Sequence, residues 1–98
     1  MSRTEEFLND PTSRWVHAPE QDRPVMTRQG IMLGITMMFD PERETYAARI
    51  LRFGLTAYDG DPDIAARKVQ RMFFVSYGAH EEDGTLAGWL SRAHEGVG

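Results

Sequence analysis

The stretch IMLGITMMF at residues 31–39 decides the expected fold, because it is the longest apolar run in the chain. As a helix it would place Ile31, Ile35 and Phe39 on one broad apolar face, and as a strand it would be a continuous buried run. Periodicity does not separate these two structures in so short a segment. Methionine is a good helix former and the run contains no valine, so the composition favours a helix, with a strand as the alternative.

The residues that follow carry the signals of a helix start. Asp40 is a suitable N-cap, Pro41 fits the first helical position, and acidic residues come next. Apolar residues then recur at steps of three and four as far as Tyr58, which predicts an amphipathic helix of about five turns. Asp59 and Gly60 would end this helix.

The same start signal recurs at residues 61–63, Asp-Pro-Asp, and predicts a helix over residues 61–78 that ends at Gly78. A polar connection would follow, and then a short helix from Thr85 that buries Trp89. The predicted fold class is therefore all-α, a compact bundle of about four helices with an extended N-terminal arm. The alternative is an α+β fold with a strand at residues 31–39.

The length of 98 residues indicates a single domain over residues 1–98, since two domains would each be too small to fold without a staple. Residues 1–24 are expected to form a short helix and a proline-rich arm, residues 25–94 the helical core, and residues 95–98 a tail. The chain has no cysteine, so disulfides, thiolate metal sites and a thiol nucleophile are excluded.

The charge and hydropathy pattern restricts the classes of partner. Eleven basic and fifteen acidic residues give a net charge of −4, which disfavours nucleic-acid binding through bulk charge. The longest apolar run is far shorter than the ~20 residues of a membrane span, and the N-terminus carries acidic residues early. We therefore expect a cytoplasmic protein without a membrane partner. The spacing of Gly30 and Gly34 leaves a homo-oligomer open.

No convincing set of catalytic or metal-binding residues is visible. A calcium loop starting at Asp59 would need glycine at its sixth and glutamate at its twelfth position, where the chain has Ile64 and Gln70. The three histidines are isolated, and there is no nucleophile elbow or phosphate loop. The sequence predicts no enzyme activity, no cofactor and no metal.

The favoured function is a small non-catalytic protein-binding protein that acts as an adaptor, subunit or inhibitor of a larger assembly. Tryptophan and arginine are enriched at binding hot spots, although a tryptophan in a proline-bounded arm can equally anchor that arm to the core. The candidate partner-binding residues are Arg14, Trp15, Val16, Arg67, Lys68, Arg71, Glu81, Glu82 and Asp83.

Two other functions stay open. A helix ending at Tyr58, a turn at residues 59–60 and the helix at 61–78 have the layout of a helix-turn-helix regulator of nucleic acid. The start of that second helix is acidic, however, which opposes contact with phosphates. The other function is a small-molecule-binding or catalytic domain with a pocket near His80 or His94.

Overall fold

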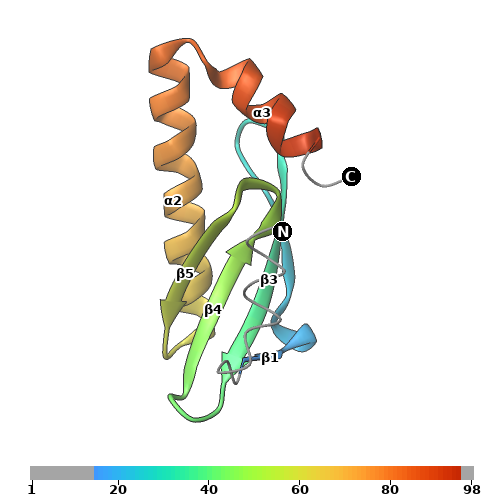
Figure 1. Ribbon diagram of the computed structural model, residues 1–98, viewed down its shortest axis with the longest axis vertical. Coiled ribbons are helices and arrows are strands. Elements are labelled where there is room, and N and C mark those ends of the chain that lie inside the picture. The colour runs from blue at the N-terminus through green and yellow to red at the C-terminus, as the bar shows by residue number, and fades with distance from the viewer. Residues whose placement is uncertain (1–14, 96–98) are drawn as a thin grey trace.

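The computed structural model of the chain describes residues 15–95, with side chains for residues 15–92. These residues form an antiparallel sheet followed by two helices, and the longer helix runs along one face of the sheet (Figure 1). The elements are β1 (Val16–His17), β2 (Arg23–Met26), β3 (Met32–Asp40), β4 (Thr45–Ile50), β5 (Leu55–Asp59), α2 (Pro62–Asp83) and α3 (Leu86–Glu95), with short 3-10 turns η1 (Pro19–Gln21) and η2 (Leu51–Phe53).

Strands β2 to β5 form a meander of successive hairpins, and β1 is added beside β3. Strands β3, β4 and β5 pair in that order, and β1 and β2 both pair with the other edge of β3. The register places Met37 opposite Ala48 and Ala48 opposite Ala57. The inward side chains of these strands meet the buried side of α2, where Val69 and Phe73 are fully buried.

The predicted all-α bundle is wrong, and residues 31–39 show the reason. Leu33, Ile35 and Met37 are buried at steps of two, whereas Met32 before them and Gly34 among them are exposed. This is the alternation of a strand whose one face is covered by other elements. The run therefore forms β3 in an α+β fold, in agreement with the alternative interpretation of these residues.

The helix predicted after Asp40 is also absent, although its capping chemistry forms. The Asp40 carboxylate accepts hydrogen bonds from the Glu42 amide at 3.0 Å and the Arg43 amide at 3.4 Å. This geometry suits a helix start and equally suits one turn of a loop. Glu44 then adopts a left-handed φ of 50°, and Thr45 pairs with Asp40 to close a β3–β4 hairpin.

The segment predicted as an amphipathic helix forms β4, η2 and β5 instead. Tyr46, Ala48 and Ile50 face the core at steps of two, and the inward residues of β5 continue the same apolar face. Gly54 provides the turn between the strands with a left-handed φ of 66°. The steps of three and four in the sequence arise from two short strands joined by a 3-10 turn.

Helix α2 begins as predicted and ends later than predicted. The Asp61 carboxylate caps it by accepting from the Asp63 amide at 2.8 Å and the Ile64 amide at 3.3 Å. The helix continues through Gly78 to Asp83 and ends at Gly84, whose φ is 72°. A glycine inside a helix costs only about 1 kcal/mol, which the packing of its neighbours can outweigh.

Helix α3 folds back over the end of the core. Its Trp89 ring lies 4.8 Å from the ring of Phe53 and 5.7 Å from that of Phe73, measured between centroids. Trp89 was expected to be buried, and it is partly buried against the core. The short helix expected within residues 1–24 falls before residue 15, outside the described part of the chain, whereas residues 15–24 contain β1, η1 and the start of β2.

Candidate protein-binding surface

One side of α2 remains exposed and combines apolar and cationic side chains. Phe74 and Val75 keep 43% and 67% of their surface exposed, and Ile64, about three turns earlier on the helix, keeps 39%. Arg67 and Arg71 are exposed between them. No acidic residue occurs from Ile64 to Ala79, so this side of an acidic protein carries local positive charge.

These residues form two shallow hollows that meet along α2. The first lies over the helix and has a volume of about 620 Å³. The second lies between α2 and β5 and has a volume of about 540 Å³. Lys68, Arg71 and Val75 line both. We call their combined lining the α2–β5 surface, and it consists of Leu55, Ala57, Ile64, Arg67, Lys68, Gln70, Arg71, Met72, Phe74, Val75 and Ser76.

Lys68 connects the helix to the edge of the sheet. Its ammonium group lies 2.9 Å from the Asp59 carboxylate and donates to the Tyr58 carbonyl oxygen at 3.1 Å. The backbone amide of Asp61 and this lysine both donate to Asp59, and together they lower the pKa of its carboxyl group below its ordinary value. Lys68 is thus partly neutralised, and the arginines of α2 provide the remaining positive charge.

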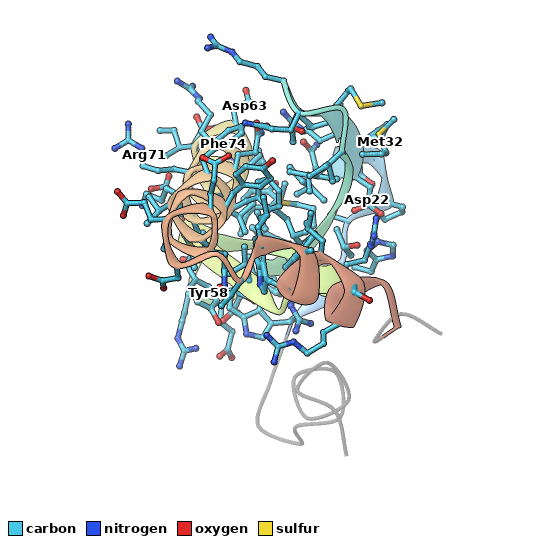
Figure 2. The ribbon with its side chains drawn as sticks, turned by 90° about the horizontal axis from the view of Figure 1, so that it is seen from above. Asp22, Met32, Tyr58, Asp63, Arg71 and Phe74 are labelled. Atoms are coloured by element: carbon cyan, nitrogen blue, oxygen red, sulfur yellow. The ribbon has the colours of Figure 1, made fainter. Side chains whose placement is uncertain are left out.

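Arg67 and Arg71 are the cations of this surface that are available to a partner. Neither forms an ion pair with any acidic side chain among the described residues. Arg71 extends from α2 away from the sheet, whereas Tyr58 lies on the other side of the sheet (Figure 2). The structure therefore brings the predicted residues Arg67, Lys68 and Arg71 together on one exposed surface.

The acidic candidates lie elsewhere on the same helix. Glu81, Glu82 and Asp83 were expected in a polar connection, but they form the exposed last turn of α2. Glu81 is ten residues after Arg71, about 15 Å along the helix axis. These carboxylates therefore do not join the cationic cluster.

The predicted residues of the N-terminal arm do not share a face of the sheet: Trp15 lies on the face opposite α2, beside Tyr58, whereas Val16 pairs with Phe39, which packs against the core. The Trp15 ring is partly buried and its centroid lies 5.7 Å from that of Tyr58. Val16 is exposed in β1, opposite Phe39, and Arg14 lies outside the described residues. Trp15 thus packs against the sheet through Tyr58. This contact supports the interpretation that Trp15 anchors the N-terminal arm to the core.

That opposite face also holds a buried cation. Arg49 is 6% exposed and its Nε donates to the Thr56 hydroxyl at 3.3 Å. Burial lowers the pKa of its guanidinium group, and the nearby Tyr58 acts in the other direction. A guanidinium remains charged in proteins under ordinary conditions, so Arg49 serves as a fixed positive charge beneath this face.

His80, one of the two histidines of the predicted pocket, belongs to the corner between α2 and α3. Its ring stacks on Trp89 with centroids 4.6 Å apart and an interplanar angle of 14°. Its Nδ1 lies 2.8 Å from the Thr85 hydroxyl, while the side chain of His94 lies outside the described part. Within residues 15–92, no three acidic or histidine side chains gather in a metal-binding arrangement.

The helix-turn-helix layout is wrong, because residues 55–59 before the turn form strand β5 and not a helix. The start of α2 also carries Asp61 and Asp63. Two carboxylates at this position oppose the approach of a phosphate backbone.

Sequence reasoning missed the apolar part of the α2–β5 surface. On the helix expected at residues 61–78, the spacing of Ile64 and Met72 predicts that both face inward, yet both are partly exposed. A usable signal was present in Met72, Phe73, Phe74 and Val75, since four consecutive apolar residues cannot all face one side of a helix. At least two of them had to point away from the core.

The chain matches no protein-family model, no curated protein sequence and no solved structure. In the part of the chain that the structure describes, no helix combines the length and the apolar character needed to cross a membrane.

Proposed function

We propose that this chain is a non-catalytic protein-binding protein, an adaptor, subunit or inhibitor, that presents the α2–β5 surface to an acidic region of a larger partner. The observation that carries the proposal is the composition of this surface. Exposed Ile64 on one side and Phe74 and Val75 on the other flank Arg67 and Arg71, and no acidic residue lies among them.

Both parts of the surface suit protein recognition. Exposed apolar side chains that gather on one face mark interaction sites more often than scattered ones do. Arginine and aromatic side chains are enriched among the residues that carry binding energy. Arginine also forms paired hydrogen bonds with carboxylates, which would select an acidic partner.

Charge reversal on α2 tests this proposal. The wild-type chain would be immobilised, its partner captured from extracts of the source cells and identified by mass spectrometry, and that partner then purified for calorimetry. We expect the double variant Arg67→Glu with Arg71→Glu to weaken binding at least about tenfold, because it turns attraction into repulsion at two contacts.

A matched control changes the net charge by the same amount elsewhere. Arg28 lies exposed in the turn between β2 and β3, and Arg92 lies exposed on α3. The double variant Arg28→Glu with Arg92→Glu should bind the partner with wild-type affinity. Equal affinity of both double variants, or the absence of any partner present in equimolar amount, would overturn the proposal.

A further inference from the structure

The sheet has an open edge beside the cationic side of α2. Among residues 15–95, β5 pairs only with β4. The bond from Lys68 to the Tyr58 carbonyl shows that this carbonyl points away from β4. Because hydrogen-bonding groups alternate in direction along a strand, the backbone amide and carbonyl of Thr56 also face the open edge.

The hollow between α2 and β5 lies directly along this edge. Leu55 and Ala57 of β5 and Met72 and Val75 of α2 provide its apolar lining, and its volume of about 540 Å³ falls in the range of ligand sites. A strand added beside β5 would direct every second side chain toward α2. Those side chains would enter the hollow, and their neighbours would face the opposite side of the sheet.

The positive charge of α2 beside this edge favours one kind of binding partner over another. A second copy pairing through β5 about a twofold axis would bring two cationic α2 helices together, and like charges placed side by side disfavour such a pair. An extended acidic segment would instead meet Arg71, which lines the hollow and has no acidic partner among the described side chains.

We propose that β5 binds an extended acidic segment of the partner protein as an added strand, with apolar side chains in the α2–β5 hollow and flanking carboxylates on the α2 arginines. This inference rests on the proposed protein-binding function and adds the mode of recognition. In strand addition, backbone hydrogen bonds provide affinity, and pockets for alternate side chains provide specificity.

Synthetic peptides test the mode without knowledge of the partner. The probe is a fluorescein-labelled peptide, Asp-Thr-Val-Thr-Ile-Thr-Asp, whose valine, isoleucine and terminal aspartates share one face of a strand. Its counterpart carries lysine in place of both aspartates. By fluorescence anisotropy, we expect the acidic peptide to bind at least about tenfold more tightly than the basic one, and Arg71→Glu to remove that preference.

Backbone methylation separates strand addition from simple docking on the surface. Two versions of the acidic peptide are made, one N-methylated at the threonines and one at the valine and isoleucine. Only one set of amides faces β5 in a paired strand, so one version should retain binding and the other should lose it. Equal affinity of the two methylated peptides would overturn the inference.

The protein offers a matched pair of variants at the same edge. Thr56→Pro removes the outward amide, and proline is tolerated at the edge of a sheet where that amide has no partner strand. Thr56→Ala removes the same hydroxyl, which accepts from Arg49, but keeps the amide. Thr56→Pro should bind the acidic peptide at least about tenfold more weakly than Thr56→Ala does. If Thr56→Pro does not fold, the methylated peptides decide.

The remaining outcomes are distinguishable. Suppose that the α2 charge-reversal variant no longer binds the natural partner, while Thr56→Pro and Thr56→Ala bind the acidic peptide equally. This result would overturn strand addition and leave the proposed function standing. No effect of charge reversal would overturn the proposed function itself. A wild-type dimer in sedimentation equilibrium that Thr56→Pro dissociates would assign the edge to a second copy and overturn the inference.

Discussion

Phe73 and Phe74 are adjacent on α2 and offer a matched test of which side of the helix is buried. Phe73 is 0% exposed, and its ring centroid lies 5.1 Å from that of Phe53 and 5.7 Å from that of Trp89. Phe73→Ala removes a fully buried ring and leaves a cavity, which costs about 3–5 kcal/mol. The free energy of unfolding of a domain is only about 5–15 kcal/mol, so much of the stability would be lost.

The same substitution at Phe74 should have a much smaller effect. Phe74 is 43% exposed, so truncation returns less apolar surface to water, and alanine is the better helix former by about 0.5 kcal/mol. We expect a net loss below about 1 kcal/mol for Phe74→Ala.

Urea unfolding followed by circular dichroism at the helix band measures both changes. For a domain of this size, the loss at Phe73 also corresponds to a fall in melting temperature of roughly 12–40 °C. Similar losses for Phe73→Ala and Phe74→Ala would refute the assignment of the Phe74 side of α2 as exposed. That result would also remove the main apolar contribution to the α2–β5 surface.

Three further predictions concern local contacts. Asp61→Ala should lower the free energy of unfolding by about 1 kcal/mol in urea titrations by removing the α2 cap, and Asp61→Ser should restore most of it. Gly54→Ala should cost about 1–2 kcal/mol through its left-handed backbone alone, since no atom lies within 4 Å of the added Cβ, whereas Gly88→Ala in α3 should not destabilise. The pKa of Asp59 is lowered in the folded state, so its stabilising contribution is complete above the unfolded value of about 3.9 and is lost as the pH falls below it. Asp59→Asn should therefore flatten the acid side of a plot of urea midpoint against pH, and an unchanged slope would contradict the assigned bonds.

The part of the fold that the sequence predicted correctly depends on local chemistry. The start of α2 at Asp61 follows from a cap, a proline and an acidic first turn, all of which act within four residues. The outward position of Arg67, Lys68 and Arg71 follows from helical periodicity alone. Such features need no knowledge of what the element packs against.

The part that failed depends on contacts between distant residues. Asp40 forms the same capping bonds that would begin a helix, but the chain reverses at Glu44 because β4 can pair with β3. Ala47 and Ala48 favour a helix in isolation, yet both are fully buried within the sheet. Pairing with neighbouring strands outweighed local propensity, as it commonly does for strands.

The same distinction between local and distant contacts applies to the candidate surface. Its charged residues were predicted from the sequence, but its hollow was not. Arg67, Lys68 and Arg71 were recognisable because charged side chains on a helix face are exposed in almost any fold. The hollow beside them requires β5, and β5 was predicted to be part of a helix. The sequence alone therefore gave no indication that residues 55 and 57 lie beside α2.

The same charges give a reason why the open edge need not pair with a second copy. An exposed edge strand is a template for self-association, and charged side chains beside it are a common protection. Here Lys68 donates a hydrogen bond to the Tyr58 carbonyl oxygen at the edge, and Arg71 lines the adjoining hollow. These cations repel the cationic α2 of a second copy and attract an acidic strand, so the same residues that protect the edge would determine which partner it accepts.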